Sequence, residues 1–174
     1  MNRTLFIFIL LSTHSFGQSI FDLARSGDEI AMKKLLDEKP NQVNALSDQG
    51  LSPFLLAAYR GNNEVAKLLI ERGADIHSCF AEGSAIYGVI YKNNLDILDF
   101  MLQKGLNVND TCQFNQFGTP LNFAMSLRRY EVIERLLKCQ VELKMTDQNG
   151  KTINELLVLY NDDKLIKLFK SYEK

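Results

Sequence analysis

A short pattern that recurs at nearly constant spacing constrains this chain more than any other feature of its sequence. Residues 52–55 (SPFL) recur as residues 84–87 (SAIY), 119–122 (TPLN) and 152–155 (TINE), at offsets of 32, 35 and 33 residues. Each copy begins with serine or threonine. Self-similarity with a period near 33 residues is typical of an array of small stacked units, in which each unit buries its apolar face against its neighbours.

A second segment repeats in register with the first. Residues 73–76 (GADI) recur as residues 105–108 (GLNV) and, in a degraded form, as residues 140–143 (QVEL). Upstream, residues 22–28 (DLARSGD) match residues 56–62 (LAAYRGN) at an offset of 34 residues. Several spaced features therefore agree in several copies, which predicts one continuous array.

The best copy resembles the ankyrin repeat. Residues 50–62 (GLSPFLLAAYRGN) follow the framework Gly-x-Thr-Pro-Leu-His-x-Ala-Ala-x-x-Gly-Asn, and residues 64–76 (EVAKLLIERGADI) match the second helix and the exit of that family. The fourth copy matches next best, through GTPLNFAM and EVIERLL. The resemblance implies an all-α repeat solenoid of stacked helix-turn-helix units with β-turn or hairpin loops, covering nearly the whole chain after its first residues.

Individual residues agree with this interpretation. Ser52 and Thr119 can cap the start of a helix with their hydroxyl groups. Gly73 and Gly105 fall just after the second helix, where a left-handed residue ends a helix well. The fourth unit has Gln140 at that position, which would cost about 1 kcal/mol in a left-handed turn, so we expect a distorted exit there.

The sequence also departs from the family pattern. The histidine of Thr-Pro-Leu-His is absent, and its place is taken by Leu55, Tyr87, Asn122 and Glu155. Any hydrogen bond made by that imidazole must be replaced or missing. Gly88 lies within the first helix of the third unit, where glycine weakens a helix, so this unit is predicted to be the least stable.

The first residues have the order of a secretory signal peptide. A single positive charge precedes an unbroken apolar run, LFIFILL at residues 5–11, and small residues lie before Gln18. We therefore expect residues 1–17 to be removed and residues 18–174 to form the ankyrin-repeat domain, exported to the periplasm or secreted, without membrane insertion after cleavage. The domain is predicted to contain five units, the outer two acting as caps: 19–46, 47–78, 79–110, 111–145 and 146–174.

Composition argues against several function classes. The whole chain has a net charge of −1, and removal of Arg3 with the leader leaves 19 basic and 21 acidic side chains, which gives no general attraction to nucleic acid. Outside the leader, His77 is the one histidine. Phosphate-loop, metal-protease and calcium-loop patterns are absent from the sequence. We expect no catalytic residues, no metal and no cofactor, and we interpret the chain as a non-enzyme.

The three cysteines leave one question open. Cys79 and Cys112 lie six and seven residues after the glycines of adjacent units. Equivalent points of stacked repeats are usually too far apart for a disulfide, although the offset of one residue could close the gap. The sequence does not decide whether they pair. Cys139, beside a helix exit, is predicted to be half-buried and unpaired.

The resemblance also indicates where a partner protein would bind. In the family the concave surface is formed by the turn tips and the inner helices. Tyr59-Arg60 and Tyr91-Lys92 place the same aromatic and basic pair on adjacent inner helices, and such residues often dominate interfaces. The remaining candidates lie on expected turn tips, where the aromatic rings could either bind a partner or pack on neighbouring loops: Phe80, Phe114, Phe117, Asp48 and Gln49.

The sequence as a whole predicts an exported protein–protein interaction module, monomeric, that binds another protein through its concave face and turn tips. Inhibition of the partner, as in an immunity-type protein, or protection of the partner is the more specific expectation. The alternative is a structural or stabilising component of an envelope or stress-response assembly. The sequence does not identify the partner.

Overall fold

The chain folds into a row of helix pairs. The structure, a computed structural model, describes residues 18–79, 83–112 and 117–172. The predicted signal peptide, residues 1–17, and the candidate residues Phe80 and Phe114 lie outside this part of the chain. Within it the elements are helical and no strand is present, which confirms the all-α prediction.

Each helix pair consists of two short helices joined by a tight turn. The described pairs are α1 (Ile20–Ser26) with α2 (Glu29–Glu38), α3 (Pro53–Arg60) with α4 (Asn63–Glu71), α5 (Ala85–Lys92) with α6 (Leu95–Gln103), α8 (Pro120–Ser126) with α9 (Tyr130–Lys138), and α10 (Ile153–Tyr160) with α11 (Asp163–Tyr172). A 3₁₀ helix, η1 (Pro40–Asn44), follows α2. The exact limits of the five units remain a prediction.

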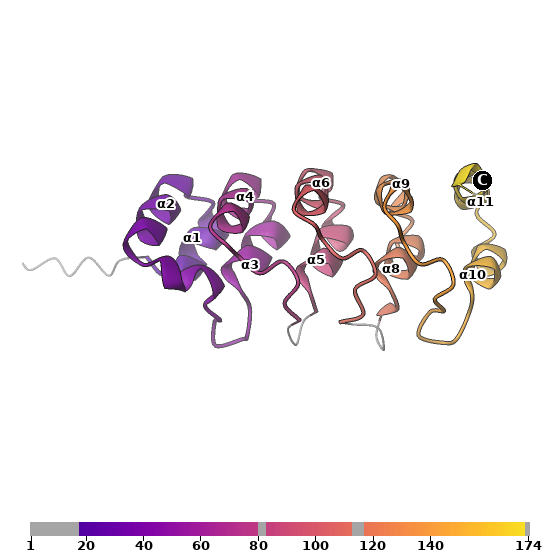
Figure 1. Cartoon of the computed structure of the whole chain (residues 1–174), viewed down its shortest axis with the longest axis horizontal. Helices are drawn as coiled ribbons and strands as arrows, with labels where there is room; N and C mark the ends of the chain where they lie inside the picture. The colour runs from indigo at the N-terminus through magenta and orange to yellow at the C-terminus, as the bar shows by residue number, and fades with distance from the viewer. Residues whose placement is uncertain (1–17, 80–82, 113–116, 173–174) are drawn as a thin grey trace, which may run out of the picture.

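The pairs stack side by side, so the first helices form one row and the second helices another (Figure 1). The segments between pairs project as loops from the same side of the array (Figure 1). Tight turns close these loops where they are described. In the loop before α3, the N–H of Ser47 donates to the carbonyl of Leu51 at 3.0 Å, and in the loop before α10, the N–H of Asp147 donates to the carbonyl of Lys151 at 2.8 Å.

The helix ends follow the sequence prediction. The hydroxyl of Ser52 accepts a hydrogen bond at 3.1 Å from a backbone N–H of the first turn of α3, and Thr119 caps α8 in the same way at 3.2 Å. Gly73 and Gly105 are left-handed, with φ of 91° and 85°. After α9 the chain instead leaves the helix in an extended conformation at Cys139, so Gln140 avoids the left-handed region and the exit is distorted, as expected.

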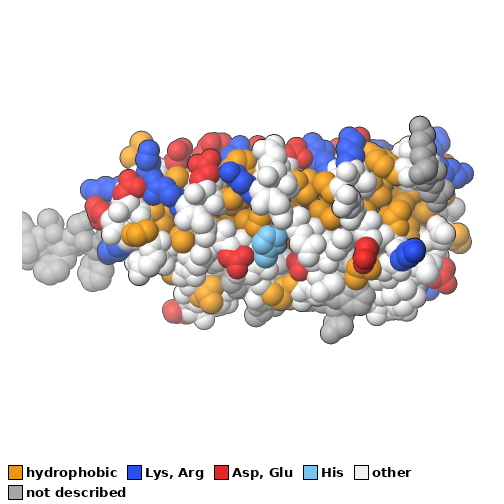
Figure 2. Space-filling view, in the orientation of Figure 1, with side chains coloured by type: hydrophobic (Ala, Val, Ile, Leu, Met, Phe, Trp, Pro, Cys, Tyr) orange, Lys and Arg blue, Asp and Glu red, His pale blue; other side chains and the backbone are white. Residues whose placement is uncertain are grey.

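A continuous core runs along the array between the two rows of helices. Its largest fully buried side chains come from every unit before the last and include Met32, Phe54, Ile86, Met101 and Ile133. The outer row carries the charges: acidic and basic side chains gather along the upper edge, over α2, α4, α6 and α9 (Figure 2). Three ion pairs join neighbouring outer helices, each exposed enough to contribute little: Asp37–Arg72, Lys67–Asp96 and Asp99–Arg135.

Asparagine side chains join the segments that follow the second helices of successive units. The Nδ2 of Asn44 donates to the carbonyl of Gly73 at 3.0 Å, and its Oδ1 accepts from the N–H of Asp75 at 2.8 Å. Asn109 makes the same two bonds to the exit of the fourth unit, at 3.3 and 2.8 Å. We call this pair of hydrogen bonds the asparagine clamp. It satisfies backbone groups that the helix ends leave unpaired.

The junction between the second and third units differs from its neighbours. His77 occupies the position of Asn44 and Asn109, four residues after the exit glycine, and in the described part of the chain its imidazole makes no clamp. Two residues after His77, a disulfide joins Cys79, in the segment between α4 and α5, to Cys112, in the segment between α6 and α8, with the Cα atoms 5.5 Å apart. The pairing that the sequence left open is therefore present. Cys139 is free and half-buried, as predicted.

Candidate functional site

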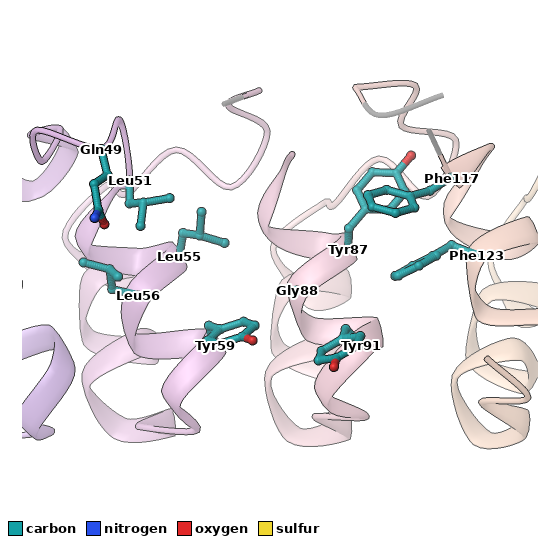
Figure 3. Close-up of a pocket in the computed structure, with 10 residues that line it drawn as sticks. All are labelled: Gln49, Leu51, Leu55, Leu56, Tyr59, Tyr87, Gly88, Tyr91, Phe117 and Phe123. Carbon is teal, nitrogen blue, oxygen red and sulfur yellow. The ribbon is translucent and has the colours of Figure 1, made fainter. Parts of the chain in front are cut away.

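An apolar groove lies on the inner helices. It has a volume of about 590 Å³ and runs from the loop before α3 across α3 and α5 to the start of α8 (Figure 3). Gln49 supplies the polar side chain at one end, and tyrosine hydroxyls supply further polar atoms. The other lining residues are Leu51, Leu55, Leu56, Tyr59, Tyr87, Gly88, Tyr91, Phe117 and Phe123. We call this hollow the α3–α5 groove.

Three aromatic rings form one wall of the α3–α5 groove (Figure 3). The ring of Phe117 lies 4.7 Å from that of Phe123 and 5.8 Å from that of Tyr87, centroid to centroid. The Tyr87 hydroxyl donates to the carbonyl of Gly118 at 2.9 Å, which ties α5 to the segment that leads into α8. Tyr87 thus supplies, at the position of the family histidine, the hydrogen bond between units that the sequence left unassigned.

The predicted pair Tyr59 and Tyr91 forms the opposite end of the groove. The two rings face each other across α3 and α5, nearly parallel, at 5°, with centroids 6.4 Å apart. Their residues are 46% and 50% exposed, so nearly half of each side chain remains free for a partner. The ammonium group of Lys92 lies 4.3 Å from the centroid of the Tyr59 ring, within the range of a cation–π interaction.

The structure brings some of the candidate residues together and leaves others apart. Tyr59, Tyr91, Phe117 and Gln49 line the α3–α5 groove. Arg60 and Lys92 lie at its edge, in a shallow depression that they share with Tyr59. Asp48 is exposed on the neighbouring loop and faces a different depression, toward α1. Phe117 both packs on Tyr87 and lines the groove, so packing and binding are not exclusive for this ring.

Sequence reasoning missed the residues that form the floor. Leu55 and Gly88 belong to the copies of the repeat, but the glycine was interpreted only as a weakness in the third unit. In the structure α5 extends over eight residues, as α3 does, and contains Gly88 in its middle. Gly88 aligns with a position on the inner helix of the second unit and lies three residues before Tyr91, on the same helix. This alignment is the signal that could have identified the floor of the groove.

The chemistry of the groove is that of a binding surface. Among the described residues, its lining contains no carboxylate, imidazole or thiol that could transfer a proton or attack a substrate. The pKa of Asp162 is lowered by the hydroxyl of Tyr130, and that of Asp96 by the ammonium of Lys67, but both carboxylates lie outside the lining and serve a helix start and an ion pair. Burial of apolar surface is therefore what this arrangement can do.

In the part of the chain that the structure describes, no group of three or more histidine, cysteine, aspartate or glutamate side chains is placed to hold a metal ion. No helix in these residues has the length and apolar character needed to cross a membrane.

The stacked pairs, the projecting loops and the inner-helix groove define a helical repeat protein. The family model described as the ankyrin repeat matches residues 49–79, which contain α3, α4 and Cys79. The chain is an ankyrin repeat protein. Ankyrin repeats are in general protein–protein interaction modules and generally not enzymes.

Relatives with ankyrin names and relatives with other names both match parts of the chain. It is 31% identical over 91 residues to "Ankyrin repeat and SAM domain-containing protein 6" of Rattus norvegicus, a match that covers 51% of this chain and 10% of the relative. It is 35% identical over 69 residues to "Palmitoyltransferase akr1" of Emericella nidulans, covering 40% of this chain and 9% of the relative. A third match, the "Nuclear factor NF-kappa-B p105 subunit" of Gallus gallus, is 23% identical over 156 residues, covering 90% and 13%. The chain thus spans about a tenth of the length of these relatives.

Proposed function

We propose that this protein is exported and binds one partner protein, as a monomer, through the α3–α5 groove and the turn tips beside it. The observation that carries the proposal is the half-exposed pair Tyr59 and Tyr91 at the mouth of an apolar groove. Large aromatic side chains next to a basic residue are the composition of interface hot spots. An exposed apolar hollow on a folded protein is a common feature of interaction sites.

Export rests on two features that agree. The sequence of residues 1–17 has the order of a secretory signal peptide, and the Cys79–Cys112 disulfide fits an oxidising compartment, where such bonds form and persist. The test is to express the full chain in its source cells and to sequence the N-terminus of the protein recovered outside the cytoplasm. A protein that begins at Gln18 supports export, and a cytoplasmic protein that keeps Met1 contradicts it.

The binding proposal is tested by capture. The chain is immobilised and exposed to envelope and secreted fractions of the source cells, in parallel with a Tyr59→Ala/Tyr91→Ala variant. A matched control, Val158→Ala/Leu159→Ala, removes two exposed apolar side chains from α10, far along the array. A partner retained by the control and lost from the folded tyrosine variant supports the groove. A partner retained by all three proteins moves the binding surface elsewhere.

The role of the complex has two candidates. An inhibitor would form a tight one-to-one complex and abolish the activity of its partner, whereas a stabiliser would leave that activity intact and extend its lifetime. We favour a role in which the partner is inhibited or protected, because a preformed groove on a rigid scaffold loses little entropy on binding. Titration of the purified partner with this protein, followed by activity and by thermal inactivation, separates the two.

A further inference from the structure

The floor of the α3–α5 groove is hollow because Gly88 has no side chain. A Cβ atom placed on Gly88 would lie 3.6 Å from the Cδ1 of Leu55 and 3.8 Å from the Cδ2 of Tyr59. These are ordinary contact distances, so the position has room for one methyl group, and a larger side chain would extend into the groove. The hollow lies between two apolar side chains of α3 and the backbone of α5 (Figure 3).

The charges around the groove have one sign at this end. Arg60 and Lys92 are both exposed beside Tyr59. Among the described residues neither has an acidic side chain within 4.0 Å, whereas Lys67, one helix away, is paired with Asp96 at 2.9 Å. The groove therefore presents an apolar hollow next to two cations that no acidic side chain of the described residues neutralises.

We propose that the partner segment bound in the α3–α5 groove carries a bulky apolar side chain followed by a carboxylate. The apolar side chain lies in the groove over Gly88, beside Leu55 and Tyr59, and the carboxylate pairs with Lys92 and Arg60. This inference rests on the proposed function and specifies the chemistry of its partner. A basic segment would be repelled by the same two cations, so charge selects among apolar segments.

Three small probes of equal shape test the chemistry without knowledge of the partner. 3-Phenylpropionate, 3-phenylpropanamide and 3-phenylpropylamine share a ring and chain but end in a negative, a neutral and a positive group. Each is titrated into the ¹⁵N-labelled full chain and followed by amide chemical shifts. Binding is expected in the millimolar range for molecules of this size. We expect shifts at Gly88, Tyr59 and Tyr91, with the anion roughly five-fold tighter than the amine.

Variants separate the hollow from the charges. Gly88→Leu fills the hollow and places a better helix former in α5, so the variant should remain folded and lose binding of all three probes. Gly88→Ala is the milder second variant and should weaken the binding of all three probes. Arg60→Gln/Lys92→Gln should bind the neutral amide unchanged and lose the preference for the anion. Val158→Ala/Leu159→Ala is the control, with binding unchanged.

Each contrary result has a definite meaning. Equal affinity of the wild-type chain for the three probes overturns the carboxylate. Unchanged binding in folded Gly88→Leu and Gly88→Ala overturns the hollow, and the absence of shifts in the groove overturns the whole inference. The proposed function is judged separately by the capture experiment. A partner that binds the wild type and is lost from the tyrosine variant would support the proposed function even if the probes failed. Binding of the probes without such a partner would leave the groove chemistry intact and refute the proposed function.

Discussion

The Cys79–Cys112 disulfide is expected to be a major contribution to the stability of the array. The two cysteines are 33 residues apart in sequence, and a link of that length removes loop-closure entropy worth about 3 to 4 kcal/mol at 25 °C from the unfolded chain. We predict that Cys79→Ser/Cys112→Ser lowers the free energy of unfolding by that amount. The melting temperature should fall by roughly 7 to 14 °C, from the size of the chain.

The assay is urea unfolding followed by circular dichroism, with and without a reducing agent. The reductant should destabilise the wild-type protein and leave the double variant unchanged, because the variant has no bridge to lose. Cys139→Ser is the control: it removes the free thiol, keeps the bridge, and should respond to the reductant like the wild type. The linear slope of the free energy with urea must be compared as well, since an array can lose cooperativity when one junction weakens.

Two outcomes would refute this reasoning. A double variant as stable as the oxidised wild type would mean that the bridge is absent in solution or that the unfolded chain is already constrained at this junction. A reductant effect that persists in the double variant would assign the loss of stability to an intermolecular disulfide of Cys139, the one cysteine that the variant keeps.

Three further predictions follow from the junctions and the buried polar groups. His77→Asn should form the asparagine clamp between His77's segment and the segment after α6. The two hydrogen bonds should raise the free energy of unfolding by about 1 to 2 kcal/mol, as measured by urea unfolding. A variant no more stable than the wild type would show that the geometry after α6 differs from that after α4 and α9. Asn122 is 3% exposed, and among the described residues neither of its side-chain amide atoms has a hydrogen-bond partner. Asn122→Leu should therefore raise the free energy of unfolding by about 1 to 3 kcal/mol, and a loss of stability would indicate that the amide holds a buried water. In the folded protein the pKa of Asp162 is lowered, first by the hydroxyl of Tyr130 and also by backbone N–H groups of α11. The contribution of Asp162 to stability is therefore present above the ordinary carboxyl pKa and is lost as the pH falls through the lowered value. Asp162→Asn should be less stable than the wild type at pH 7, with the difference shrinking in acid, and a difference independent of pH would remove this carboxylate as the cause.

Much of the fold follows from local rules that the sequence displays openly. The hydroxyl caps at Ser52 and Thr119 and the left-handed glycines at 73 and 105 are decided within one turn of helix, so the repeat predicts them without knowledge of the neighbours. The distorted exit at Gln140 follows from the same rule, because only the absent glycine needed to be noticed.

The rest depends on contacts between units, which no single copy of the repeat contains. The asparagine clamp joins Asn44 to residues some 30 positions later, and nothing around Asn44 distinguishes it from a surface asparagine. The sequence identified Tyr59 and Tyr91 but could not show that their rings face each other. Gly88 is the clearest case. Its low helix propensity predicts that it destabilises α5, but its effect on the shape of the groove becomes visible only once the structure places Leu55 and Tyr59 of α3 beside it.

The covalent link joins the segments that lead into two of the groove helices. Cys79 lies between α4 and α5, and Cys112 lies between α6 and α8, so the bridge holds together the segments that precede α5 and α8. Both of those helices line the α3–α5 groove. Noncovalent contacts between neighbouring units can open locally, as seen by hydrogen exchange, whereas thermal fluctuation does not break this bond. The α5–α8 side of the groove should therefore keep its shape while the ends of the array fray, and a change of redox conditions, rather than of temperature, would be the means to alter it.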